Sequence, residues 1–231
     1  IRRDPVIQLM RYAMVSNPDF IDTPQLPQTL RQQALDLPDG SNPRTRELVD
    51  RWRAETPDDD AFARRVLEHF NREAFHYALD APLLGRHPVD EFLFESRTGF
   101  CEHYASSFAV MMRMAGIPAR IVTGYMGGWY NAMGDYYLVR QSDAHAWTEV
   151  LVDGAWRRID PTAAVAPSRI ESGLSRAVAD DEPVPLFARL DAGWLKNVQL
   201  AFDSLNHAWR RDVVGFNRDR QRELWRDLTL D

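Results

Sequence analysis

One cysteine occurs in this chain at a position that suits a nucleophile. Cys101 is the only cysteine among 231 residues, and it stands where the turn Thr98-Gly99-Phe100 runs into a helical pattern. At a helix N-terminus, the helix dipole and the backbone N–H groups stabilise a thiolate and lower its pKa. The same N–H groups can stabilise an oxyanion. The position therefore favours a reactive thiol over the buried, inert thiol that a lone cysteine usually is.

A hairpin downstream is predicted to bring a histidine and an aspartate onto one face of a sheet. Residues 153–154 are Asp-Gly, a strong signal for a two-residue turn. With that turn His145 faces Thr162, Trp147 faces Asp160, and all four side chains share one face. Asp160 is then the diagonal neighbour of His145, at roughly 7–8 Å between backbone positions. Asp160 can accept from one imidazole nitrogen and leave the other nitrogen to face a thiol.

Two other polar residues compete for these roles. Asp143 shares a face with His145, two residues earlier on the same strand, and is a second candidate for the orienting acid. His103 is closer to Cys101 in sequence, but side chains two residues apart on a helix point about 200° apart. His103 is therefore expected to be a supporting polar residue that does not face the thiol.

Other patterns point away from metal and serine chemistry. Ser106 and Ser107 lack a G-x-S-x-G context. The acidic run at residues 58–60 lacks EF-hand spacing and is expected to be a solvated helix start. The remaining histidines show no HxxxH or Cys/His zinc spacing; they are His69, His76, His87 and His207. No metal and no cofactor is predicted.

The composition excludes further classes of protein. The formal net charge is −6, which argues against binding to nucleic acid. No run of about 18 apolar residues occurs, so no membrane-spanning helix is predicted within this sequence. Hydrophobic residues make up 45%, with seven Trp and eleven Phe, enough for a sizeable core. A single cysteine allows no internal disulfide and leaves the cellular compartment open.

The chain is predicted to have three parts. Residues 1–40 form an N-terminal arm, in which residues 6–15 are a strand or short helix and prolines interrupt the remainder. Residues 41–165 form the core. Residues 166–231 are a linker followed by a helical extension, with helical periodicity at 194–213 and in a final short helix from Asn217.

Within the core, the sequence predicts helices first and strands afterwards. Asn42-Pro43 and Thr56-Pro57 both read as an N-cap followed by proline at the first helical position. A third, largely buried helix covers residues 101–115. Strands are predicted at 120–125, 136–139, 144–152 and 155–159, with an extended piece at 75–77. Glu149 and Arg158 are expected to form a cross-strand ion pair.

Segments of this core resemble the transglutaminase-like superfamily. Residues 99–105 and 115–120 resemble its cysteine helix and the strand that follows. Residues 145–150 resemble its histidine strand, and residues 156–162 its aspartate strand. Their order and spacing agree across about residues 60–165, and three motifs in the right order are a far more specific signal than any one alone.

The resemblance implies a fold and a reaction. The fold is α+β: a papain-like core in which the cysteine helix packs on an antiparallel sheet, with the N-terminal arm and C-terminal helices added. In the implied reaction Cys101 attacks a glutamine carboxamide, His145 protonates the departing ammonia, and Asp160 orients His145. An amine such as lysine, or water, then resolves the thioester.

The resemblance also implies substrates and further site residues. Expected substrates are proteins or peptides that supply glutamine and amine groups, and no calcium requirement is expected. The backbone N–H of Cys101 would be one oxyanion donor, with Tyr77 and Trp52 as candidates for the second. Trp147 and Trp129 are candidates for lining the acyl-donor groove, with packing in the core as the alternative for both.

Two other functions remain open at this stage. The same Cys-His-Asp triad could serve a cysteine peptidase or amidase, including one that acts on cell-wall peptides, because acceptor choice depends on pocket shape and water access. A non-catalytic binding module with this fold is the third possibility, although all three triad residues are present.

The flanks narrow the resemblance. Residues 162–171, 202–209 and 214–216, together with Gln221, look like membrane-anchored bacterial transglutaminase-like proteins of the TgpA type. In that group the domain faces the periplasm between membrane segments of an inner-membrane protein. The C-terminal helices would then lead towards a membrane segment, and a chain that starts at Ile1 is expected to be a piece of a longer protein.

Overall fold

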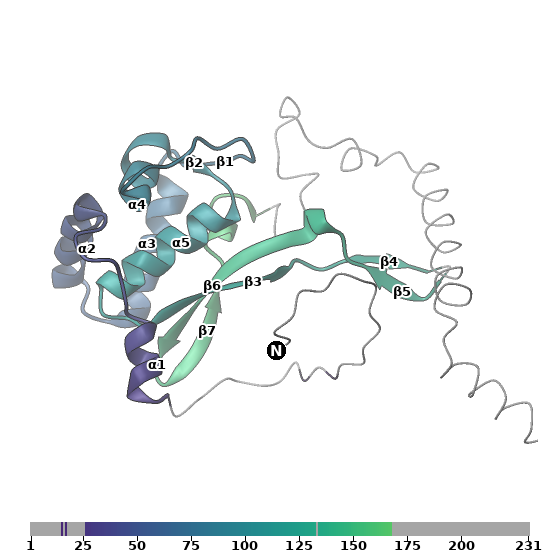
Figure 1. The fold of residues 1–231 in the computed structure, drawn as a ribbon, viewed down its shortest axis with the longest axis horizontal. Helices are drawn as coiled ribbons and strands as arrows, with labels where there is room; N and C mark the ends of the chain where they lie inside the picture. Colours follow the sequence, from purple (N-terminus) through teal and green to yellow (C-terminus); the bar gives the residue numbers. More distant parts are fainter. Residues whose placement is uncertain (1–14, 16, 18–25, 133, 168–231) are drawn as a thin grey trace, which may run out of the picture.

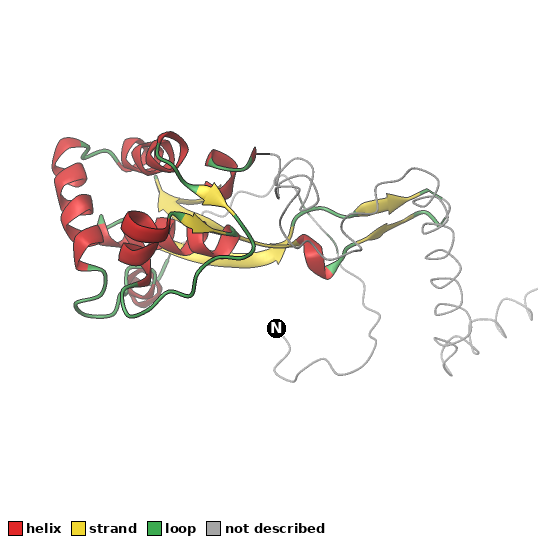
Figure 2. Cartoon of the chain, turned by 90° about the horizontal axis from the view of Figure 1, so that it is seen from above, coloured by secondary structure: helices red, strands yellow, loops and turns green. Residues whose placement is uncertain are grey.

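The computed structural model describes residues 15, 17, 26–132 and 134–167 (Figure 1). Helices form one layer and an antiparallel sheet forms another, seen from a second direction in Figure 2. The predicted α+β class and the packing of the cysteine helix on the sheet are confirmed. The predicted helices after residue 194, and residues 6–14 of the arm, lie outside the described residues.

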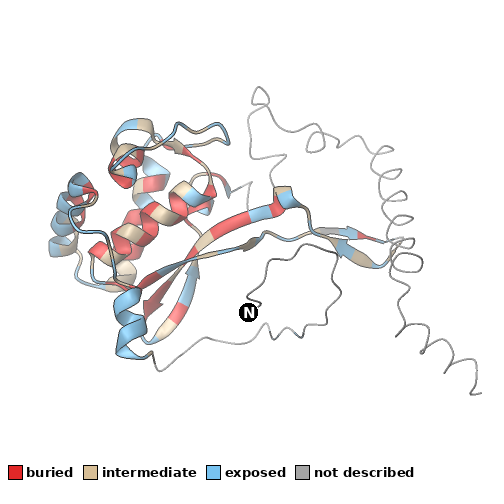
Figure 3. Cartoon of the chain, in the orientation of Figure 1, coloured by how far each residue is buried: buried red, intermediate tan, exposed pale blue. Residues whose placement is uncertain are grey.

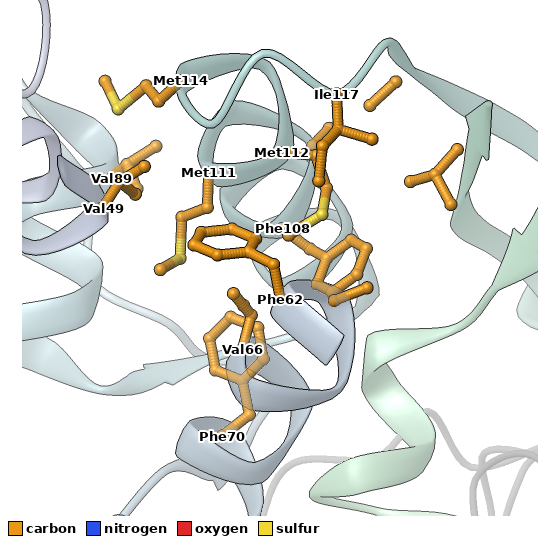
Figure 4. Packing of buried hydrophobic residues seen from close by; sticks show 14 of the residues in the cluster. Val49, Phe62, Val66, Phe70, Val89, Phe108, Met111, Met112, Met114 and Ile117 are labelled. Carbon is orange, nitrogen blue, oxygen red and sulfur yellow. The ribbon is translucent and has the colours of Figure 1, made fainter. Parts of the chain in front are cut away.

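The central helix, α5 (Cys101–Met114), is buried along most of its length. The prediction for residues 101–115 is confirmed to within one residue, since Ala115 caps the helix and Gly116 follows with a φ of +81°. Figure 4 shows Phe108, Met111 and Met112 of this helix meeting aromatic and aliphatic side chains of α3 (Asp59–Arg72). Burial of these side chains, each worth about 1.5–3 kcal/mol, stabilises the helical layer.

Among the described residues, β3 (Ala119–Tyr125), β6 (Ala144–Val152) and β7 (Ala155–Ile159) form a sheet in the order β3-β6-β7. The predicted hairpin register is confirmed from Val152–Ala155 to Thr148–Ile159. The further pairs predicted for Trp147 with Asp160 and for His145 with Thr162 do not form, because β7 ends at Ile159. One face of β6 carries Ala146, Thr148, Val150 and Val152 and packs against α5. Figure 3 shows buried residues concentrated along α5 and β6. The opposite face of β6 carries the odd-numbered residues, His145 among them.

The remaining elements are one long helix, α2, and several short segments. They are α1 (Gln28–Gln33), α2 (Pro43–Glu55), β1 (His76–Tyr77), α4 (Pro88–Glu91), the π-helical turn η1 (Phe92–Ser96), β2 (Thr98–Gly99), β4 (Trp129–Asn131), β5 (Tyr136–Leu138), and the 3₁₀ turns η2 (Gln141–Asp143) and η3 (Pro161–Ala164). The strands β4 and β5 pair as a separate ribbon that extends away from the helices (Figures 1 and 2). Sequence patterns did not predict α1, α4, η1 or β4.

Two local predictions are wrong. The N-cap of α3 is Asp58, whose carboxylate accepts from Ala61 N at 2.7 Å, so the cap lies two residues beyond Thr56. Glu149 and Arg158 do lie opposite each other, but Glu149 forms its ion pair with Arg120 of β3 at 2.7 Å. A central strand offers a neighbour on each side, and pairing rules for one hairpin cannot choose between them.

The described end of the predicted arm is part of the packed structure. Ala119 at the start of β3 donates its N–H to the carbonyl of Ala34 at 2.9 Å. Ala34 also packs with Leu151 and Trp156 on the sheet face that points away from α5. Residues 26–34 therefore cover one end of that face.

Two helix N-termini cap each other. The buried carboxylate of Asp90, in α4, accepts from Thr45 N at 2.7 Å, Thr45 Oγ1 at 2.6 Å and Arg44 N at 3.0 Å. In return, Asn42 Oδ1 accepts from the backbone N–H groups of Val89 and Asp90. Because each side chain satisfies donors of the other helix, the start of α2 is tied to α4.

No helix in the described ranges is long and apolar enough to cross a membrane.

We predict that Asp90→Ala lowers the free energy of unfolding by about 3 kcal/mol, because two amides and a buried hydroxyl lose their acceptor. Asp58→Ala, which removes a single cap at an exposed position, should cost about 1 kcal/mol. Urea denaturation of both variants measures the difference. Equal losses would contradict the mutual capping of α2 and α4.

Candidate active site

The start of α5 presents Cys101 at the first helical position. The preceding turn is held by a reciprocal pair: His103 N donates to the Phe100 carbonyl at 2.9 Å, and Phe100 N donates to His103 Nδ1 at 3.3 Å. Cys101 is 9% exposed. The thiol thus lies at the positive end of a helix dipole, as the sequence predicted, and the structure adds that it is buried.

His145 and Asp160 are brought together by the β6–β7 hairpin. His145 Nε2 lies 2.6 Å from Asp160 Oδ2, and the histidine side chain is fully buried. The pairing of β7 ends at Ile159, so Asp160 leaves the sheet as the cap of η3, where its Oδ1 accepts from Thr162 N at 3.2 Å. An acceptor-only carboxylate fixes the proton of the neutral imidazole on Nε2. Cys101 is among the groups that interact with His145, and Nδ1 is the nitrogen that Asp160 leaves available to the thiol.

The charge state of His145 reflects three influences. Burial is the largest and by itself lowers the pKa of His145. The hydrogen bonds and charges of Asp160 and Cys101 act in the opposite direction and outweigh it, so that the pKa is raised above its ordinary value of 6.5. A raised pKa makes the histidine hold its proton more firmly, which favours its stabilising a thiolate and later donating to a leaving group.

The alternative orienting acid, Asp143, serves another purpose. Its Oδ2 accepts from Arg140 N at 2.8 Å and closes the turn η2, which precedes β6. Asp143 is buried, and its backbone carbonyl accepts from Met126 N at 2.7 Å. Of the two acids that the sequence left open, the structure brings Asp160 to His145.

The two candidates for the second oxyanion donor lie in different parts of the structure. Tyr77 lies on β1, opposite Gly99 of β2, two positions before the cysteine. Trp52 lies on α2, where its ring meets His69 at 5.1 Å and the Arg65 guanidinium at 5.1 Å. The structure therefore brings Tyr77 to the beginning of the cysteine helix and leaves Trp52 between α2 and α3.

The two candidate groove residues also differ. Trp147 lies beside His145, with ring centroids 6.3 Å apart and planes at 22°. The backbone of Trp129 begins β4, and its side chain lies outside the described part of the structure. Only Trp147 can be placed relative to the candidate triad.

Sequence reasoning missed two residues next to this site. Arg158 was assigned to an ion pair, but its guanidinium lies 4.2 Å above the Trp147 ring. Gly124 lies opposite His145 on β3, and a Cβ there would come within 2.9 Å of Trp147 Cη2. A glycine inside a strand pattern often marks such a close approach, and this was the available signal.

In the described part of the chain, no group of three or more His, Cys, Asp or Glu side chains is placed to hold a metal ion.

Comparison with known proteins identifies the protein family. The family model of the transglutaminase-like superfamily matches residues 46–161, a range that contains Cys101, His145 and Asp160. The chain belongs to the transglutaminase-like superfamily.

Particular relatives are bacterial. The chain is 41% identical over 227 residues to the protein-glutamine gamma-glutamyltransferase of Pseudomonas aeruginosa, covering 95% of this chain and 34% of that protein. It is 33% identical over 145 residues to the uncharacterised protein YebA of Bacillus subtilis, covering 58% of this chain and 19% of YebA. This chain thus spans about a third of the first relative and a fifth of the second.

A solved structure agrees with the fold. The crystal structure of the periplasmic domain of TgpA from Pseudomonas aeruginosa superposes with a TM-score of 0.65 at 46% identity, covering 67% of this chain and 54% of that one. The same domain bound to ethylmercury gives a TM-score of 0.62.

We predict that Asp160→Asn lowers the pH at which His145 loses its proton, because the charged acceptor at Nε2 disappears. Since the folded pKa is raised, the pair contributes stability that is fully present below about pH 6.5 and lost as the pH rises through the folded pKa. Histidine-selective NMR titration measures the midpoint. Asp143→Asn is the control, and a larger shift in that variant would assign the orienting role to Asp143 instead.

Proposed function

We propose that this chain is the catalytic part of a protein-glutamine γ-glutamyltransferase. The observation that carries the proposal is the buried His145 Nε2–Asp160 Oδ2 contact of 2.6 Å, which leaves the second imidazole nitrogen to a cysteine at a helix start. The 41% identity to a protein of that name supports the same reaction.

The reaction follows from the roles of the three residues. The Cys101 thiolate attacks the carboxamide carbon of a glutamine side chain, and the carbonyl oxygen becomes an oxyanion near the N-terminus of α5. His145 donates its proton to the nitrogen as the C–N bond breaks, so ammonia leaves and a thioester remains. Neutral His145 then removes a proton from an incoming primary amine, which attacks the thioester. The products are an isopeptide bond and regenerated Cys101.

The substrates follow from this chemistry. One is a protein or peptide that carries a glutamine side chain, and the other is a primary amine such as a lysine side chain. Water in place of the amine would make the chain an amidase, and attack on a backbone amide would make it a cysteine peptidase. Those reactions use the same triad, so the assay below separates them.

The surroundings of the domain are also part of the proposal. We infer that residues 41–165 form the catalytic core and that residues 166–231 lead towards a membrane segment of a longer, inner-membrane protein. The chain would then act in the periplasm. The relative that supports this location is the periplasmic domain of TgpA.

The direct test is covalent incorporation of a labelled primary amine into a glutamine-containing peptide, with ammonia release measured in parallel. We expect incorporation by the wild type and a loss of at least ~10⁴-fold in Cys101→Ala, because no other nucleophile can form the thioester. Circular dichroism should show the same fold in both. Peptide cleavage without amine incorporation would replace transfer by hydrolysis, and full turnover by Cys101→Ala would refute the mechanism.

We further expect Tyr77 to be the second oxyanion donor, because β1 places it beside the strand that leads into Cys101. Tyr77→Phe should lower kcat by about 10²-fold and leave KM largely unchanged, since the lost hydrogen bond forms mainly in the transition state. Trp52→Phe, which alters the other candidate, should leave kcat within about 2-fold. The reverse order of effects would transfer the role to Trp52.

A further inference from the structure

The sheet face that points away from α5 carries a stack of side chains beside His145 and Asp160 of the candidate triad. Trp147 and His145 are next-but-one neighbours on β6, so their side chains project from the same face. Their rings are 6.3 Å apart and nearly parallel. Asp160 lies on this side as well, in hydrogen-bond contact with His145. The indole is thus a near neighbour of the imidazole that the proposed reaction uses.

The position of the Trp147 ring is not set by a hydrogen bond. Its Nε1 atom is buried and has no hydrogen-bond partner among the described residues. A buried indole N–H usually finds a partner, which then fixes the ring. The orientation of the Trp147 ring must therefore come from packing against the groups around it.

Gly124 makes room for one edge of the ring. It lies opposite His145 in the β3–β6 ladder, and a Cβ added there would lie 2.9 Å from Cη2 and 3.1 Å from Cζ3 of Trp147. Glycine within a strand is destabilising relative to alanine, so its presence here calls for a reason. The absence of a side chain at this position lets the indole lie over β3 on the side of His145.

The Arg158 guanidinium packs on a face of the ring. Its guanidinium carbon lies 4.2 Å from the centre of the Trp147 ring. The carboxylate opposite it in the ladder, Glu149, is held by Arg120 at 2.7 Å, and Arg158 forms no ion pair within the described residues. A planar, weakly hydrated guanidinium stacks well on an aromatic face, so the indole is the principal partner of Arg158.

We propose that Arg158 is a positioning residue of the candidate triad: its guanidinium clamps Trp147 against the sheet at Gly124, and the indole in turn holds and shields the imidazole of His145. This inference rests on the proposed function for its catalytic consequence, but its geometry is independent of the substrate. It assigns Trp147 to the support of His145, where the sequence suggested the wall of a groove.

The stack matters for a physical reason. A hydrogen bond between charged groups is stronger where water is excluded, and a large aromatic ring beside the imidazole excludes it. The charged or titratable groups around His145 and Trp147 are Asp160, Cys101, Arg158, and the Arg120–Glu149 pair further along the sheet. Asp143 precedes the strand and is engaged by the Arg140 amide. A loosened indole would weaken both the burial that lowers the pKa of His145 and the hydrogen bonds that raise it, so His145 would titrate closer to its ordinary value and its imidazole would be less well aligned.

The chain contains a matched control for this stack. Arg120 lies 4.2 Å above the ring of Trp156, on the same sheet face and away from His145. Arg158→Lys keeps the charge but loses the flat stacking surface, and Arg120→Lys makes the same change at the control stack. Trp147→Phe and Trp156→Phe form the second matched pair.

The experiment combines the NMR titration of His145 with kcat and KM for amine incorporation. We expect Arg158→Lys and Trp147→Phe to move the His145 midpoint towards 6.5 and to lower kcat about 10-fold, with KM within about 2-fold, because misalignment affects the chemical step. The two control variants should match the wild type in both measurements.

Two results would overturn the inference. A rise in KM with an unchanged His145 midpoint would make Trp147 and Arg158 a substrate-binding surface. If Arg158→Lys and Trp147→Phe match their control variants in both measurements, the stack has only a structural role. The NMR titration needs no substrate, so it decides on Arg158 even if the wild type transfers no acyl group and the proposed function fails.

Discussion

The geometry of the candidate site depends on how α5 lies against β6. Thr148 is fully buried on the helix-facing side of β6, and its hydroxyl donates to the carbonyl of Ala105 at 2.9 Å. Ala105, one turn into the helix, is itself buried and packs with Cys101 and Ala146. A helix carbonyl and a strand hydroxyl are thus joined close to both reactive side chains. Any sliding of the helix along the strand would leave the buried Thr148 hydroxyl unsatisfied, at a cost of about 1–3 kcal/mol.

The rest of the helical layer supports this contact from behind. Phe62, Val66 and Phe70 of α3 pack on the side of α5 that points away from the sheet. The mutual caps of Asn42 and Asp90 bind α2 to α4, which in turn pack on α5. These contacts lie far from Cys101, but they set the direction of the helix axis and so the direction in which its first N–H groups point. The distance between the thiol and the imidazole is therefore a property of the whole helical layer.

Sequence reasoning reached the parts of this site that depend on short-range geometry. The Asp-Gly turn at residues 153–154 determines the β6–β7 register, and this register brings Asp160, directly after the last residue of β7, to His145. The prediction of where α5 begins likewise depended only on neighbouring residues. The choice between Asp143 and Asp160 was not local, because each carboxylate accepts from a backbone N–H group and only the fold shows which one also reaches His145. The Glu149–Arg158 pair failed for the same reason: β3 supplied Arg120, and no rule confined to one hairpin includes the third strand.

Two glycines show how the remaining geometry escapes sequence patterns. Gly99 precedes the cysteine helix, and a Cβ there would lie 2.7 Å from His103 Cβ, so the imidazole that holds the turn before Cys101 packs directly on the glycine. Gly124 gives room to Trp147 in the same way beside His145. Cys101 and His145 thus each lie near an aromatic ring that packs where a glycine has no side chain. A glycine in a sequence indicates either backbone freedom or the close approach of another group, but it does not show which group approaches. At Gly99 and Gly124 that group is an aromatic ring, and only the fold shows this.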